Sequence, residues 1–183
     1  MARTPSNMMP LGTQAPDFSL SNPRTGEQLS LSEAQGNKGT LIMFICNHCP
    51  YVIHLKNELG KLSDYMPQGL GIVAISSNDV ESYPADAPDK MVDFAQENGF
   101  KFPYLYDESQ SVARDYNAAC TPDFFLFDTH NKCVYRGRYD ASTPGNNEDK
   151  DGKDLLGAVD ALLADKPVSP EQQPSIGCNI KWK

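Results

Sequence analysis

Two short, continuous apolar runs stand out along the chain, at Thr40–Ile45 and Gly71–Ser76. Both are rich in β-branched residues and too short for isolated helices, so they predict strands that are buried on both faces of a sheet. Between the two runs, Tyr51–Met66 carries apolar residues at near-helical spacing, which predicts a helix. A second helix is predicted after the second run, at Asp89–Asn98. The order strand, helix, strand, helix predicts parallel pairing of the two strands.

Alternating apolar and polar residues predict two antiparallel hairpins, one on each side of this core in the sequence. The first joins Phe18–Leu20 to Gln28–Leu31 through a short loop that contains Asn, Pro and Gly. The second joins Phe124–Phe127 to Val134–Arg138. The first hairpin is therefore expected as an N-terminal extension of the central sheet.

Three shorter segments complete the expected elements. Phe102–Tyr106 is typical of a short edge strand, Ser109–Tyr116 of a short helix, and Asp154–Ala164 of a last amphipathic helix. Together with the runs above, they predict an α/β protein with a central mixed sheet.

The domain organisation follows from where this periodic pattern begins and ends. We expect an N-terminal arm over residues 1–11, one domain over residues 12–165, and a C-terminal tail over residues 166–183. The tail carries Ile176, Ile180 and Trp182, so we expect it to dock on the domain. A length of 183 residues fits one such domain with extensions.

Charge and hydropathy narrow the range of partners. The net charge of -8 gives little attraction for phosphate backbones or anionic lipid, so nucleic acid and membranes are disfavoured as partners. No apolar run has the length of a signal peptide core or of a ~20-residue membrane span. We therefore expect a cytoplasmic protein, and these features leave its oligomeric state open.

The chain has five cysteines, at positions 46, 49, 120, 133 and 178. An odd number, spread over a chain long enough to build a core, is not typical of a disulfide-stapled secreted scaffold. In a reducing compartment the close pair Cys46 and Cys49 is instead expected to be catalytic or metal-binding. The sequence alone does not decide whether Cys178 reaches that pair.

The segment Cys46-Asn47-His48-Cys49-Pro50 follows a predicted buried strand and opens a predicted helix. Two thiols at this spacing can close and reopen a disulfide without a large backbone movement. Unsatisfied N–H groups and the positive dipole end of the helix stabilise a thiolate on Cys46, which we expect to be the nucleophile, with Cys49 as the resolving thiol. His48 is expected to lower the pKa of Cys46 further and to give a more oxidising disulfide than that of thioredoxin, at ~-270 mV.

A second candidate feature is Cys120-Thr121-Pro122, directly before the strand at Phe124–Phe127. A cis bond before Pro122 would expose the backbone N–H and C=O of Thr121 for pairing with a substrate strand. Cys120 would then lie near the redox pair as a third redox thiol, a metal ligand or a small buried residue.

At these residues the chain resembles the thioredoxin-like superfamily, and more narrowly the AhpC/TSA-related cytosolic thioredoxin family proteins with a Cys-Asn-His-Cys-Pro-Tyr segment. The resemblance rests on three segments and on the element order: Ala15–Leu20, Phe44–Pro50 and Cys120–Phe124. It implies a three-layer α/β/α fold, with Cys46 and Cys49 as the redox pair and Pro122 as a cis-proline that faces it.

The chain departs from the family pattern at several positions. Ile45 replaces the aromatic residue that precedes the pair in thioredoxins, and Thr40 stands where thioredoxins keep a buried acid. The group that handles the Cys49 proton is therefore unassigned, with His54 as a candidate. In the resembling peroxiredoxins, the peroxidatic cysteine falls at Cys49, but Cys46 replaces the family's Thr.

Three function classes follow. The first is a thiol–disulfide oxidoreductase that acts on protein or small-molecule disulfides, with a thiol or dithiol reductant and no cofactor. The second is a thiol-dependent peroxidase with antioxidant activity, in which Cys49 or Cys46 is oxidised to a sulfenic acid. The third is a metal-binding module that uses Cys46, Cys49, His48 or Cys120 for copper(I) or zinc.

Overall fold

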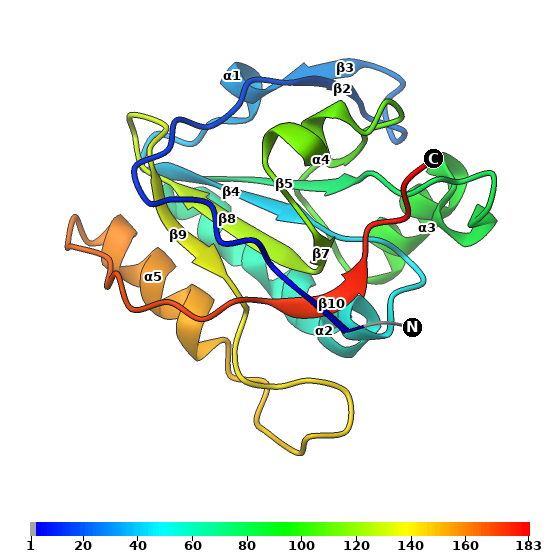
Figure 1. Cartoon of the computed structure of the whole chain (residues 1–183). Coiled ribbons are helices and arrows are strands. Elements are labelled where there is room, and N and C mark those ends of the chain that lie inside the picture. The colour runs from blue at the N-terminus through cyan, green and yellow to red at the C-terminus, as the bar shows by residue number, and fades with distance from the viewer. Residues whose placement is uncertain (1–2) are drawn as a thin grey trace.

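The computed structural model describes residues 3–183, and it is organised around a mixed sheet of seven strands (Figure 1). From one edge to the other, the strands are β3 (Gln28–Ser30), β2 (Ser19–Ser21), β6 (Tyr104–Tyr106), β5 (Leu70–Ser76), β4 (Gly39–Phe44), β8 (Asp123–Phe127) and β9 (Cys133–Gly137). The two longest apolar runs form β4 and β5, which lie at its centre and pair in parallel as the pattern predicts.

Antiparallel strands flank the parallel centre on both sides. β8 pairs antiparallel with β4 and with β9, so the second predicted hairpin is confirmed. β2 and β3 form the first hairpin and add to the sheet through a short bridge from Ser21 to Tyr106. This bridge corrects one prediction, because β6 was expected at an edge and instead lies between β5 and β2.

Helices cover both faces of the sheet, which gives the three-layer α/β/α arrangement. One apolar core lies between the sheet and three helices, α2 (Pro50–Lys61), α3 (Pro88–Glu97) and α5 (Lys153–Leu163). A second core lies on the opposite face, under α1 (Leu31–Ala34) and α4 (Ser111–Asp115). The thioredoxin-like fold class expected from the sequence is confirmed by this layering.

The helix after the cysteine pair is shorter than its apolar pattern predicts. α2 buries Val52, Leu55 and Leu59 on one face, a spacing that matches the helical repeat. It then tightens at Leu62 into a 3₁₀ helix, η1 (Leu62–Gln68), which contains Pro67. Because proline lacks the N–H that an α-helix interior needs, the regular helix cannot continue through this segment.

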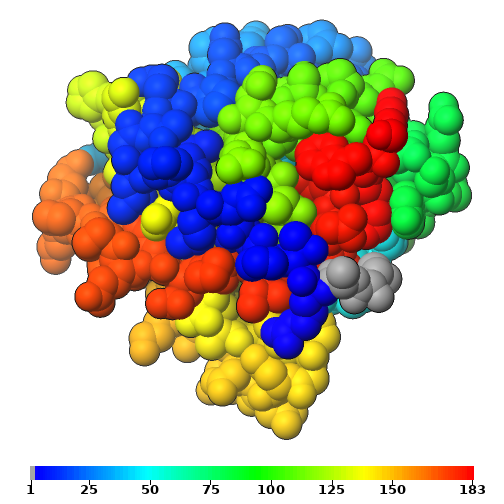
Figure 2. All heavy atoms as spheres, viewed as in Figure 1, coloured from blue at the N-terminus to red at the C-terminus, as the bar shows by residue number. Residues whose placement is uncertain are grey.

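A second, small sheet joins the two ends of the chain. Its order is β1 (Arg3–Pro5), β10 (Ile176–Asn179) and β7 (Cys120–Thr121), with antiparallel pairing throughout. In Figure 2 the N-terminal and C-terminal segments, blue and red, lie side by side on one face of the molecule. The arm and the tail therefore contribute strands, which their sequences did not indicate.

No helix within residues 3–183 is both long and apolar enough to cross a bilayer.

Candidate active site

The cysteine pair lies where the central strand β4 turns into α2. Cys49 is the N-cap residue of α2, and Pro50 occupies the first helical position, where its missing N–H costs no hydrogen bond. Both thiols are buried, with Cys46 1% exposed and Cys49 0% exposed. The sequence prediction of a strand-to-helix junction at this pair is therefore confirmed.

Thr121 lies against both thiols. The Sγ atom of Cys46 is 3.4 Å from Thr121 Oγ1, and the Cys49 thiol donates to the Thr121 carbonyl oxygen at 3.2 Å. The peptide bond between Thr121 and Pro122 is cis, as the sequence led us to expect. The fold thus brings together two segments that are about 70 residues apart in the chain.

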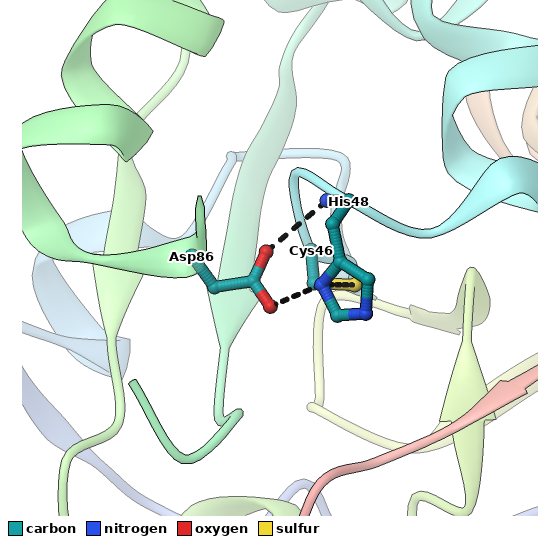
Figure 3. A group of neighbouring side chains, drawn as sticks. All are labelled: Cys46, His48 and Asp86. Carbon is teal, nitrogen blue, oxygen red and sulfur yellow. Dashed lines mark hydrogen bonds and ion pairs between the residues drawn. The ribbon is translucent and has the colours of Figure 1, made fainter. Parts of the chain in front are cut away.

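His48 is held by a buried carboxylate that sequence reasoning missed (Figure 3). His48 Nδ1 lies 2.6 Å from Asp86 Oδ2 and 4.0 Å from Cys46 Sγ. The ring stacks on Tyr83 with centroids 5.3 Å apart, and its side chain is 19% exposed. His48 is therefore a partly exposed neighbour of the buried Cys46 sulfur.

Asp86 also fixes the backbone of the loop between the two cysteines. It lies in the short 3₁₀ helix η2 (Pro84–Asp86), and its Oδ1 accepts hydrogen bonds from the backbone N–H groups of Asn47 and His48, at 2.8 and 3.2 Å. Asn78 donates to Oδ2 at 2.8 Å. Nothing in the polar loop sequence distinguishes this acid from its neighbours, so only the tertiary structure reveals its role.

The reduced thiols titrate as one pair. A hydrogen bond from Cys46 to Cys49 raises the pKa of Cys46 well above its ordinary value, and burial and the Asp86 carboxylate act in the same direction. The same hydrogen bond lowers the pKa of Cys49, although burial opposes it. The expectation of a lowered pKa at Cys46 is therefore wrong for the reduced pair.

The Thr121 carbonyl acts against a permanent charge on Cys49. At 3.2 Å this oxygen accepts a hydrogen bond from a Cys49 thiol and repels a thiolate. The Thr121 hydroxyl lowers the pKa of both thiols. The single proton of a monoanionic pair can thus lie on either sulfur.

Two further cysteines lie close to the pair. Cys120 is fully buried beside Thr121, and burial, followed by the charge of Asp123, raises the pKa of its thiol. Cys178 lies on β10 directly opposite Thr121, and the Cys178 and Cys49 thiols shift each other's pKa. Cys120 was a predicted member of this site, whereas the position of Cys178 depends on the docking of the tail.

His54, the expected candidate for handling the Cys49 proton, is bonded elsewhere, and a buried acid lies next to Pro122. His54 Nε2 is 3.1 Å from Ser142 Oγ, and burial lowers the pKa of His54. A different acid, Asp123, is fully buried on β8, and burial raises its pKa well above the ordinary value. Asp123 lies directly opposite Phe44, at the end of β4. It was not identified from the sequence, although it immediately follows Pro122.

A cavity of about 410 Å³ opens next to Pro122. Its walls include Tyr51 and His54 from α2, together with Arg3 and Arg138. Arg138 forms an ion pair with Asp154, and Arg136 donates hydrogen bonds to the Met9 carbonyl and to the Gln172 side chain. The cysteines themselves do not line this cavity.

One group of side chains has the donor set of a metal site. The ligand atoms of Cys46, His48 and Asp86 lie within 4.8 Å of one another, and this is the set found among residues 3–183. A thiolate, an imidazole and a carboxylate are ligands that zinc accepts. However, His48 Nδ1 and both Asp86 oxygens are already hydrogen-bonded as described above.

Comparison with known proteins places the chain in a class and then in a family. A thiol–disulfide oxidoreductase ResA from Bacillus thuringiensis is 26% identical over 129 residues, which is 69% of this chain and 68% of that protein. A thiol–disulfide oxidoreductase from Bacteroides fragilis has the same fold, with a TM-score of 0.62, 22% identity, and coverage of 82% of this chain and 99% of that one. These matches define a thioredoxin-like protein.

The family model named Redoxin matches residues 10–156, and the chain belongs to this family. An uncharacterised conserved protein from Geobacillus kaustophilus superposes over 100% of this chain and 97% of its own, with a TM-score of 0.98 and 53% identity. The expected membership of the thioredoxin-like superfamily is thus confirmed.

Proposed function

We propose that this protein is a thiol–disulfide oxidoreductase that uses a Cys46–Cys49 redox disulfide. The observation that carries this proposal is the shared contact of both thiols with Thr121, the residue before cis-Pro122. The pair is placed at the helix N-terminus, where a thiolate is stabilised. The relationship to thiol–disulfide oxidoreductase ResA supports the same activity.

In the proposed cycle, Cys46 is the nucleophile. A Cys46 thiolate attacks one sulfur of a substrate disulfide, a mixed disulfide forms, and the first substrate thiolate leaves. Cys49 then attacks the Cys46 sulfur, which closes the Cys46–Cys49 disulfide and releases the second substrate thiol. An external thiol or dithiol reductant returns the pair to its reduced state.

The surroundings of the two sulfurs support this division of roles. Thr121 contacts both sulfurs, but Cys46 lies beside the partly exposed His48, whereas Cys49 lies beside the buried Cys178. A substrate that approaches from solvent would therefore meet Cys46 first. An imidazolium at His48 would draw the shared charge of the pair toward Cys46.

Protein and small-molecule disulfides are both proposed as substrates. The cavity beside Pro122 offers room for groups that flank the reacting disulfide, with Tyr51 and His54 on one wall. Because the backbone of Thr121 pairs with β10, we propose that substrate contacts form at Pro122 and in this cavity before any pairing with Thr121. A reducing compartment, the cytoplasm, suits a pair that must be re-reduced by thiols.

Thiol trapping tests the proposal. The Cys49→Ser variant should retain a mixed disulfide on Cys46 after exposure to a disulfide substrate, because no resolving thiol remains. Wild type should reduce insulin with dithiothreitol as the reductant, and Cys46→Ser should not. Cys133→Ser is a matched control, since it removes a buried cysteine outside the site. The proposal fails if neither single variant captures a mixed disulfide.

One observation favours a second candidate, a thiol-dependent peroxidase with Cys49 as the peroxidatic residue. The lowered pKa of Cys49 would keep it ionised at neutral pH. Peroxide would oxidise the Cys49 thiolate to a sulfenic acid, and Cys46 would then condense with it to form the disulfide and water. The resembling peroxiredoxins polarise the peroxide with an arginine, and two of the nearby candidates here, Arg136 and Arg138, are held by other groups, which counts against this role. Consumption of hydrogen peroxide with the same reductant tests it.

A metal-binding role is the third candidate, through the cluster of Cys46, His48 and Asp86. Binding would have to replace the hydrogen bonds that already join His48 to Asp86. Elemental analysis of protein purified without chelator tests this role, since a stoichiometric metal that blocks thiol labelling would overturn the redox assignment.

A further inference from the structure

The C-terminal strand occupies the position where a substrate strand was expected to pair. β10 runs antiparallel to β7, with Cys178 opposite Thr121 and Asn179 opposite Cys120. On its other side β10 is held by β1, with Arg3 opposite Cys178. The edge next to the cis-proline is thus filled by the protein's own chain.

The contact between β10 and β7 is unusually close. A Cβ atom added to Gly177 would lie 1.9 Å from the carbonyl oxygen of Thr121, so only glycine allows this approach. The hydroxyl of Ser175 also donates a hydrogen bond to the Pro122 carbonyl. β10 is therefore fixed against both residues of the cis peptide.

The pairing of β10 with β7 places Cys178 beside the residue that contacts both thiols of the redox pair. Side chains directly opposite each other on antiparallel strands lie on the same side of the sheet, so the side chain of Cys178 lies on the same side as that of Thr121. The Thr121 hydroxyl contacts Cys46, and its carbonyl contacts Cys49. Cys178 is 1% exposed, and the neighbouring Cys49 raises the pKa of its thiol.

We propose that Cys178 is a third redox-active thiol, which takes over the disulfide from the Cys46–Cys49 pair by bonding to Cys49. This inference rests on the proposed function. In this step β10 occupies the strand position beside Thr121, and Cys178 reacts with Cys49, whereas a substrate reacts with Cys46. Its role differs from that of Cys120, whose sulfur lies 3.8 Å from the Pro122 carbonyl.

The step is an internal thiol–disulfide exchange and needs no external oxidant. Cys178 loses its proton, and its sulfur attacks the Cys49 sulfur of the Cys46–Cys49 disulfide. The Cys49–Cys178 bond forms, the Cys46–Cys49 bond breaks, and the electron pair leaves with Cys46, which takes up a proton. The oxidising equivalent is then held in a buried disulfide, while Cys46 is reduced again.

Ionisation of Cys178 is easier in the oxidised protein than in the reduced one. Burial and the neighbouring Cys49 both raise the pKa of Cys178, whereas Lys181 lowers it. Once Cys49 is part of a disulfide, its thiolate charge is absent and one of the two raising effects is removed. The attacking Cys178 thiolate is thus formed more easily in the oxidised protein, which is the state that the exchange requires.

Peptide mapping of an oxidised Cys46→Ser variant tests this proposal. Cleavage after Lys and Arg places Cys49 in the peptide of residues 39–56 and Cys178 in that of residues 154–181, while Cys120 and Cys133 fall in two other peptides. After oxidation with diamide, we expect a crosslink between the peptides 39–56 and 154–181. The crosslink should be lost in Cys46→Ser/Cys178→Ser and kept in Cys46→Ser/Cys133→Ser.

The outcomes separate this inference from the proposed function. A crosslink of Cys49 to Cys120, or no internal disulfide in Cys46→Ser, would overturn the role of Cys178. Insulin reduction by the wild type and the mixed disulfide that Cys49→Ser traps on Cys46 test the proposed function independently. If those two tests succeed and the crosslink does not form, only the third-thiol proposal fails.

Discussion

His48 Nδ1 and Asp86 Oδ2 lie 2.6 Å apart, and the same imidazole nitrogen is 4.0 Å from the sulfur of Cys46. Asp86 is fully buried and holds His48 through both its ring and its backbone N–H. A carboxylate that orients a histidine in this way also fixes where its proton lies. Through His48, Asp86 in η2 therefore influences the ionisation and reactivity of the Cys46 thiol.

The Asp86→Asn variant should separate the charge of this carboxylate from its anchoring of the loop. The Asp86 charge raises the pKa of Cys46, so in a Cys49→Ser background the alkylation of Cys46 should shift to lower pH. The rate of insulin reduction by Asp86→Asn alone should fall roughly 10-fold. This corresponds to a rise of ~1.4 kcal/mol in the activation free energy when the loop and His48 are held less well.

Asp89→Asn is the control for Asp86→Asn, since Asp89 is exposed at the start of α3. It should leave both the alkylation profile and the insulin rate unchanged. An Asp86→Asn protein with a wild-type alkylation profile would contradict the electrostatic role of Asp86.

Replacement of His48 should make the disulfide harder to reduce. An imidazolium beside Cys46 stabilises its thiolate, and thus the reduced form, so His48→Gln should lower the redox potential by about 30 mV, as ~1.4 kcal/mol of lost stabilisation implies. Equilibration with glutathione measures this shift. His54→Gln, whose side chain is bonded at Ser142, should leave the potential unchanged. A potential equal to that of wild type in His48→Gln would rule out tuning by this residue.

Loosening of β10 should expose the thiols. In Gly177→Ala the new methyl group would meet the Thr121 carbonyl, so β10 must move away from β7, at a cost of about 1–3 kcal/mol. Alkylation of Cys46 and Cys49 by iodoacetamide should then be at least ~10-fold faster than in wild type.

Gly157→Ala provides the matched control for Gly177→Ala. Gly157 is an exposed position in α5 where an added Cβ meets nothing within 4 Å, so this variant should be as stable as wild type or up to ~1 kcal/mol more stable. Equal alkylation rates in Gly177→Ala and wild type would show that β10 does not cover the pair.

Asp123 should make the stability of the protein depend on pH. Burial raises its pKa in the folded state, so the unfolded chain holds fewer protons than the folded one at any pH between the unfolded value, ~3.9, and the raised folded value. Its contribution to stability is fully present below pH ~3.9 and is lost as the pH rises through the folded pKa.

Asp123→Asn removes this titration, so the free energy of unfolding of the variant, relative to wild type, should increase from pH 4 to pH 8. Urea denaturation at the two pH values measures it. Asp115→Asn, at an exposed position, should show no such trend. A difference between Asp123→Asn and wild type that is the same at both pH values would show that Asp123 is not held protonated.

Local sequence patterns were sufficient for the central fold. The short, β-branched apolar runs predicted the buried strands β4 and β5, and the helical repeat after Cys49 predicted a helix that faces the core. The edge position of β6 was wrong, because a hairpin distant in the sequence adds to that side of the sheet. A local pattern cannot specify such long-range pairing.

The sequence by itself predicted a cysteine pair at a strand-to-helix junction, because this depends on local spacing and local backbone geometry, and the resemblance to thioredoxin-like proteins implied the cis-proline. Only the tertiary structure brought in Asp86, Asp123 and Cys178, which come from a polar loop, a buried strand and the tail. It also reversed the expected pKa of Cys46. Burial and the charges of neighbours set a pKa, and both exist only once distant segments have packed together.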